Sequence, residues 1–100
     1  MDRRRLCVYM LASKKNGVLY VVVTSDLIKR IWQHQNDVVE GFTHRYDIHT
    51  LVWYKLHLAM ESAILREKSL KGWERAWKVR LIESENASWR DFYADLLSPD

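Results

Sequence analysis

Residues 6–24 read LCVYMLASKKNGVLYVVVT and carry the clearest structural signal in the chain. Two apolar, β-favouring runs, 6–12 and 19–24, flank Asn16-Gly17. That dipeptide is typical of tight turns between antiparallel strands. We therefore expect a β-hairpin.

The hairpin decides which side chains share a face of the sheet. A two-residue turn at positions 16–17 would pair Tyr9 with Thr24. Paired residues point the same way and successive residues alternate, so Tyr9, Tyr20 and Val22 are expected on one face. Any loop with an even number of residues preserves this result.

A helix is expected directly after the hairpin. Ser25-Asp26 can cap its amino end, and apolar residues then recur with helical spacing. Arg30 and His34 are four residues apart and share a face beside that apolar stripe. Residues 36–50 lack a clear period and predict a long loop with a basic and aromatic tip at 43–46.

The second half predicts one more strand and further helices. The strand is expected over 51–58, and a helix over 60–71 that Gly72 interrupts. Trp73 and Trp77 recur in the next helical segment, and Ser88 with Asp91 would form a capping box for a last helix. We expect these aromatic residues mostly in the core.

The amino-acid composition limits the number of domains and the kinds of partner that can be expected. With 48% hydrophobic residues, three Gly and one Pro in 100 residues, the chain is expected to be one domain over 1–100, not a disordered linker. Sixteen Lys and Arg against thirteen Asp and Glu give a net charge of +3, which favours a polyanionic partner. The lone Cys7 excludes an internal disulfide framework and suggests a cytoplasmic setting. The apolar run at 6–12 is too short to predict export or a membrane partner.

Glu67 is the most informative anomaly in the predicted helices. It falls near the centre of a stripe formed by Met60, Ala63, Ile64 and Leu70. A carboxylate there needs a compensating partner, because desolvating a charge costs several kcal/mol. An ion pair with Lys71, one turn onward, would provide it, and so would a bound Mg²⁺ ion. The spacing leaves both interpretations open.

A set of ordered motifs resembles a known nuclease family. The set comprises Val8-Tyr9-Met10, nine residues, Tyr20-Val21-Val22, then Thr24-Ser25-Asp26-Leu27, Arg30, Arg66-Glu67-Lys68, Trp77-Lys78 and Asn86-Ala87-Ser88-Trp89. Together these segments, over about 8–93, resemble the GIY-YIG nucleases, in particular the small stand-alone bacterial branch. UvrC-type repair nucleases and certain homing endonucleases carry the same module. The resemblance implies an α/β chain of the α+β type, with a three-stranded antiparallel sheet flanked by helices.

The resemblance also implies a site that cleaves nucleic-acid backbones. The matching catalytic positions are Tyr9, Tyr20, Arg30, Glu67 and Asn86. Glu67 would hold Mg²⁺ or Mn²⁺, and Arg30 would donate to the phosphate oxygens. Tyr9 would activate or orient the attacking water and Tyr20 would position water or phosphate. Asn86 would brace the site by hydrogen bonding.

Other residues are candidates for auxiliary roles. His34 is expected at the helix surface, and the resemblance allows it to assist proton transfer or to contact phosphate. Lys14, Lys15, Lys29 and Arg45 could line a track for phosphates. Scattered solvated charges are the alternative interpretation of the same residues.

Val22 departs from the family pattern, which has glycine at that position. Its isopropyl group would project toward Tyr9 and Tyr20, where glycine would allow close approach of a ligand. We therefore expect a weak or substrate-restricted endonuclease, with DNA as the expected substrate and repair as the expected context. A catalytically silent nucleic-acid-binding module and a protein-interaction module are the alternatives. A protein partner could supply specificity, while substrate architecture and oligomeric state stay open.

Overall fold

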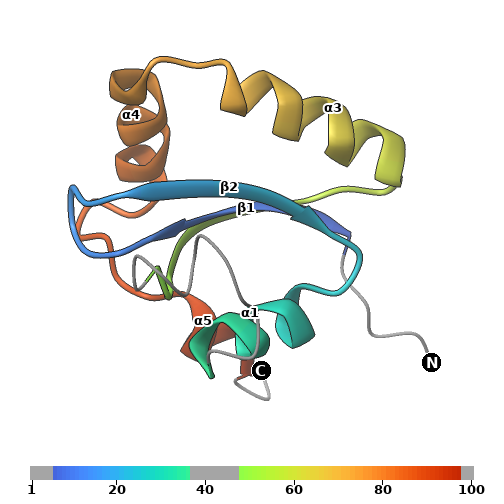
Figure 1. Cartoon of the computed structure of the whole chain (residues 1–100), viewed down its shortest axis with the longest axis horizontal. Coiled ribbons are helices and arrows are strands. Elements are labelled where there is room, and N and C mark those ends of the chain that lie inside the picture. The colour runs from blue at the N-terminus through green and yellow to red at the C-terminus, as the bar shows by residue number, and fades with distance from the viewer. Residues whose placement is uncertain (1–5, 37–47, 98–100) are drawn as a thin grey trace.

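The computed structural model describes residues 6–36 and 48–97, and these form an antiparallel sheet with helices on both faces (Figure 1). The three-stranded α+β architecture expected from the sequence is confirmed. The elements are β1 (Cys7–Ala12), β2 (Leu19–Thr24), α1 (Leu27–Gln35), β3 (Thr50–Leu56), α3 (Met60–Lys71), α4 (Arg75–Glu85) and α5 (Tyr93–Leu97). None of the helices in these ranges is both long and apolar enough to cross a bilayer. The predicted loop tip at 43–46, and Arg45 with it, lies outside the described residues.

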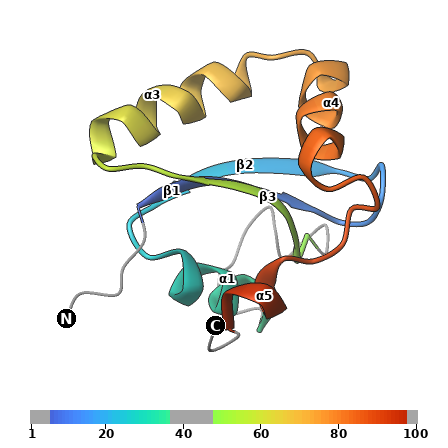
Figure 2. The same ribbon diagram turned by 180° about the vertical axis from the view of Figure 1, so that it is seen from behind.

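The strand order β2-β1-β3 places β1 in the centre of the sheet, with every residue buried. Val8, Met10 and Ala12 pack toward α3 and α4, whereas Cys7, Tyr9 and Leu11 pack toward α1. Figure 2 shows these two helical layers on opposite sides of the sheet. Both faces of β1 are covered, which explains its uninterrupted apolar sequence.

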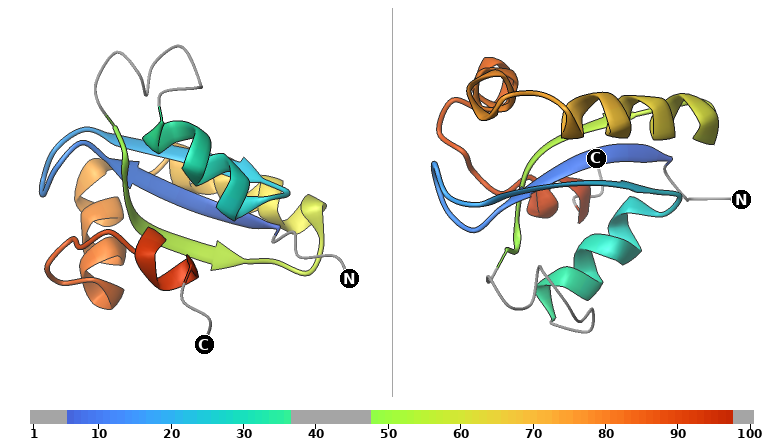
Figure 3. Two further views of the ribbon diagram at one scale, coloured as in Figure 1. Left: turned by 90° about the horizontal axis from the view of Figure 1, so that it is seen from below. Right: turned by 45° about the horizontal axis from the view of Figure 1, so that its top comes forward.

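Helices α1 and α5 lie on the same face of the sheet and cover different strands. Figure 3 shows α1 over β1 and β2, with α5 beside β3. Leu27 and Ile31 anchor α1 to the sheet, and Asp26 caps that helix as expected, because its carboxylate accepts the Lys29 amide at 3.3 Å. Helix α3 packs on β1 and β2 from the other side and keeps its predicted bounds.

The hairpin register differs from the two-residue turn expected at positions 16–17. The Ser13 amide donates to the Val18 carbonyl at 3.1 Å, so the loop has four residues and Tyr9 pairs with Val22. Asn16 adopts a left-handed φ of 59°. At Gly17 a Cβ atom would collide with the Ser13 hydroxyl oxygen, so the wider turn still requires glycine. The register shift is even, and the predicted face is therefore retained.

The carboxyl-terminal segment corrects two further expectations. The last helix begins at Tyr93 and not at Ser88, because Trp89 has a φ of 60°, which a helix cannot accommodate. Asp91 accepts the Tyr93 amide at 3.0 Å and so takes the capping position predicted for Ser88. Trp77 was expected in the core, but it is 50% exposed and lies outside it.

Candidate active site

Tyr9 lies in the middle of the central strand and has no exposed surface. Its hydroxyl lies 3.1 Å from Nε2 of His34, which α1 brings over the sheet. The guanidinium of Arg30, one helical turn earlier, is close enough to that hydroxyl to favour its ionised form. The phenol oxygen therefore lies beside an imidazole and near a permanent cation.

His34 corrects a prediction, since it is 2% exposed and not at the helix surface. It follows Leu27 and Ile31 on the buried face of α1, so the same rotation that packs these residues turns the imidazole toward the sheet. The edges of the imidazole and the two tyrosine rings meet, with centroids 6.1 Å from Tyr9 and 6.4 Å from Tyr20. Tyr9, Tyr20, Arg30 and His34 thus form one cluster.

Burial sets the protonation states in this cluster. It raises the pKa of Tyr9 well above its usual value, an effect that the Arg30 guanidinium partly offsets. Burial, with the nearby charges of Arg30 and His49, lowers the pKa of His34 to about 4. At neutral pH the imidazole is therefore uncharged. With its proton on Nδ1, the imidazole accepts a hydrogen bond from the Tyr9 hydroxyl through Nε2. The positive charge of Arg30 favours the phenolate form of Tyr9.

Val22 occupies the position directly across the hairpin from Tyr9. It packs in the same cluster as Tyr9 and Tyr20, which confirms the face expected for all three residues. Its side chain therefore occupies space beside the phenol where the family motif carries only a hydrogen. The expectation that Val22 restricts the site stays a prediction.

Glu67 lies in the other helical layer, on α3. Its side chain is 15% exposed, and its carboxylate pairs with the Lys71 ammonium at 3.2 Å, so the ion pair is present, which was one of the two alternatives that the spacing left open. The Lys71 side chain is 56% exposed, so the pair lies at the surface. The structure thus brings together Tyr9, Tyr20, Arg30 and His34, and places Glu67 on the helix that covers the opposite face.

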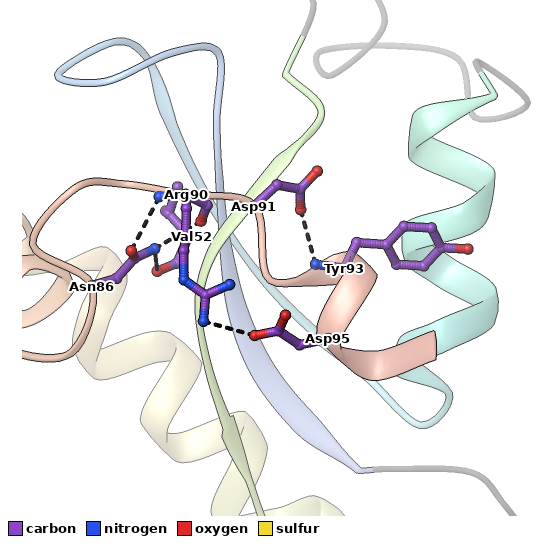
Figure 4. A network of polar contacts seen from close by, with 6 residues as sticks. All are labelled: Val52, Asn86, Arg90, Asp91, Tyr93 and Asp95. Atoms are coloured by element: carbon purple, nitrogen blue, oxygen red, sulfur yellow. Dashed lines mark hydrogen bonds and ion pairs between the residues drawn. The ribbon is translucent and has the colours of Figure 1, made fainter. Parts of the chain in front are cut away.

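Asn86 is a buried brace beside β3 (Figure 4). Its amide nitrogen donates to the Val52 carbonyl at 3.0 Å and to the Arg90 carbonyl at 2.8 Å. Its amide oxygen accepts the Arg90 backbone N–H at 3.1 Å. These contacts tie the segment after α4 to the sheet, a position apart from the Tyr9 cluster.

The proposed phosphate track is exposed where the structure describes it. Lys14 and Lys15 lie in the hairpin loop and Lys29 lies on the outer surface of α1. Their exposure leaves both interpretations of these charges, phosphate contact and ordinary solvation, as predictions.

The comparison with protein families decides the ancestry of this arrangement. The model of the GIY-YIG catalytic domain matches residues 5–80, which include both tyrosines, Arg30 and Glu67. The chain belongs to the GIY-YIG family. Asn86 lies beyond the matched residues. Neither the curated proteins nor the solved structures compared with the chain gave a match.

GIY-YIG nucleases generally use a divalent metal, and the described residues limit how one could be held here. Within 6–36 and 48–97 no three His, Cys, Asp or Glu side chains group closely enough to enclose an ion. A cation held by a single carboxylate, with water and substrate phosphate as the other ligands, is an arrangement that Mg²⁺ commonly adopts. The Glu67 carboxylate, which pairs with an exposed ammonium, fits that requirement.

Proposed function

We propose that this GIY-YIG chain is a divalent-metal-dependent endonuclease that hydrolyses phosphodiester bonds, with DNA as the expected substrate. The observation that carries the proposal is the Tyr9 hydroxyl beside a neutral imidazole and near a guanidinium. An isolated phenol has a pKa of about 10 and is a poor base at neutral pH. A phenol whose oxygen is fixed 3.1 Å from an imidazole and lies near a guanidinium is instead suited to orienting the attacking water.

The roles follow from these contacts. His34 fixes the Tyr9 hydroxyl through Nε2, and the Tyr9 oxygen orients the attacking water. Arg30 donates to the non-bridging oxygens of the phosphate as charge builds on them. Mg²⁺ or Mn²⁺ held by Glu67 would supply electrostatic stabilisation of the leaving oxygen.

The edge strand β2 is the place where the two parts of the site can act together. Tyr20 lies on β2 and belongs to the α1 face, whereas α3, which carries Glu67, packs on β1 and β2 from the other side. A phosphodiester lying along this edge would have the tyrosine cluster on one side and the carboxylate on the other. Access to Tyr9 then requires a local opening past Val22, and we propose that cleavage is slow for this reason.

Cleavage of labelled single-stranded, duplex and branched DNA and RNA with Mg²⁺ or Mn²⁺ tests the proposal. Wild-type protein is expected to cut at least one of these substrates, and Glu67→Ala to abolish cleavage. Arg30→Ala is expected to reduce the rate about a hundredfold or more, by analogy with loss of one transition-state donor. Metal-independent cleavage, or full activity of Glu67→Ala, would contradict the assigned roles.

A second candidate function is nucleic-acid binding without cleavage. It is favoured by the complete burial of Tyr9 and by Val22 directly opposite that residue. Binding that weakens steeply with salt, with no cleavage of any substrate under either metal, would support it, because the salt slope reports phosphate contacts.

We further propose a cytoplasmic setting and a place in DNA repair. The setting is supported by Cys7, a free thiol with no exposed surface, which suits a reducing compartment. Repair is supported by the use that related modules make of this chemistry. Reaction with branched or damaged duplexes in the cleavage assay would favour the repair role over other uses.

A further inference from the structure

A groove on α4 is separate from the tyrosine cluster. It encloses about 360 Å³ and is lined by Trp73, Trp77, Arg80, Leu81 and Ser84. Its volume is within the range of small-ligand sites, roughly 300–1,000 Å³. Trp77 exposes 50% of its surface, although it is one of the largest apolar residues of the chain. A half-exposed indole in a groove is a surface that a planar ligand can cover.

The position of Trp77 is fixed by its neighbours. Its ring meets that of Trp73 edge to face, with centroids 6.0 Å apart and an interplanar angle of 80°. The guanidinium of Arg66 lies 5.0 Å from the centroid of the Trp73 ring. Trp73 is thus held between α3 and α4 and supports Trp77, so the exposed ring is pre-oriented.

The electrostatics of the groove favour an anionic chain. Arg80 supplies a cation to the lining, which holds no carboxylate. Two acids of α4 are engaged elsewhere, because Glu83 accepts the Trp89 indole N–H at 2.7 Å and Glu85 accepts the Trp53 indole N–H at 2.8 Å. Exposed aromatic surface beside a cation is the combination that binds single-stranded nucleic acid.

We propose that this groove binds an unpaired nucleic-acid base, which stacks on Trp77 while a neighbouring phosphate pairs with Arg80. The proposal rests on the proposed function and specifies its substrate as one with a single-stranded or unpaired segment. Arg66, which contacts Trp73, directly precedes Glu67, so α3 links the groove to the carboxylate. A strand cut near Glu67 would therefore extend one or more nucleotides to α4.

The binding test uses fluorescence anisotropy with a labelled single-stranded oligodeoxynucleotide in EDTA, where cleavage does not interfere. Trp77→Leu keeps apolar bulk and removes the aromatic face, and Trp77→Phe restores an aromatic face. Trp32→Ala is the matched control, because Trp32 is also 50% exposed but lies on α1. An oligonucleotide of the same length made of abasic sites keeps the phosphates and removes the bases. Circular dichroism verifies that each variant is folded.

Trp77→Leu is expected to raise the dissociation constant at least about fivefold, the lower end of what one stacked base contributes. Trp77→Phe should recover most of the affinity, Trp32→Ala should retain it, and the abasic strand should bind wild type and Trp77→Leu equally. Equal affinity of Trp77→Leu and wild type for the normal strand would overturn the proposal and favour an apolar protein partner for the groove. A loss of affinity in Trp32→Ala as large as that in Trp77→Leu would also overturn the proposal.

The outcome is separable from that of the nuclease proposal. Cleavage that depends on Glu67, together with binding that does not depend on Trp77, would overturn only the proposal that the groove binds a base. Trp77-dependent binding with no cleavage under any condition would overturn only the nuclease.

Discussion

Acidification should destabilise this protein through one residue, His34. Its imidazole has 2% of its surface exposed and lies among Tyr9, Tyr20, Arg30 and the nearby His49. These surroundings lower its pKa to about 4 from an ordinary value of 6.5. The unfolded chain therefore binds the proton first. The contribution of His34 to stability is complete above about pH 7 and is lost as pH falls from about 6.5 toward 4.

The size of the effect follows from the two pKa values. The gap between 6.5 and about 4 corresponds to about 3 kcal/mol between the two protonation states. For a domain stabilised by roughly 5–15 kcal/mol, that is a large fraction of the total.

Urea unfolding at several values between pH 7.5 and 4 measures this contribution directly. His34→Gln keeps a polar side chain and cannot titrate, so it serves as the reference for every other ionisable group. The free energy of unfolding of wild type minus that of His34→Gln is expected to fall by about 3 kcal/mol between pH 7 and 4. Parallel curves for the two proteins across that range would refute the argument.

Three further changes have expected outcomes. Val22→Gly should increase the cleavage rate while lowering the free energy of unfolding by about 1–3 kcal/mol, since it removes partly buried methyl groups and frees a strand backbone. An unchanged or lower rate in the folded variant would count against steric obstruction. Asn86→Ala should cost about 2–3 kcal/mol in urea unfolding, because it leaves the Val52 carbonyl and two Arg90 backbone groups without their partner; a loss below about 0.5 kcal/mol would contradict the bracing role. Cys7, whose pKa burial raises to about 12, should resist alkylation at pH 8 until urea unfolds the chain, as followed by mass spectrometry, and rapid labelling of the native protein would contradict its burial.

The sheet could be predicted from local sequence because its signals are local. Two apolar, β-favouring runs and Asn16-Gly17 define the hairpin, and the alternation of side chains places Tyr9 beside Val22 even though the loop is longer than expected. The exact register could not be predicted, since a four-residue loop preserves the same alternation. The bounds of α3 could also be predicted from a local signal, because Gly72 directly follows the last turn of the helix.

The burial of His34 was missed because only apolar residues were assigned to the buried stripe of α1. Leu27, Ile31 and His34 follow the i, i+4, i+7 spacing of one helix face, but the periodicity of apolar residues does not show whether a polar residue at such a position is buried. The same limitation applies to Trp77. Helical spacing placed it in line with Trp73, yet α4 turns that side of the helix toward solvent.

The predicted start of the last helix was wrong because of the backbone conformation before it. Ser88 and Asp91 satisfy the spacing of a capping box, but Trp89 adopts a left-handed conformation and redirects the chain before Tyr93. Its indole donates to Glu83, and the ring is buried against the sheet. Such a tertiary anchor overrides a local capping signal.

The measurement that bears most directly on the central claim is the rate of Mg²⁺-dependent DNA cleavage by Tyr9→Phe relative to wild type. Phenylalanine preserves the packing of the ring and removes only the hydroxyl that lies 3.1 Å from His34. We predict that Tyr9→Phe stays folded, retains nucleic-acid binding and loses cleavage by about a hundredfold or more. Cleavage by Tyr9→Phe at the wild-type rate would contradict the assignment of this hydroxyl to catalysis.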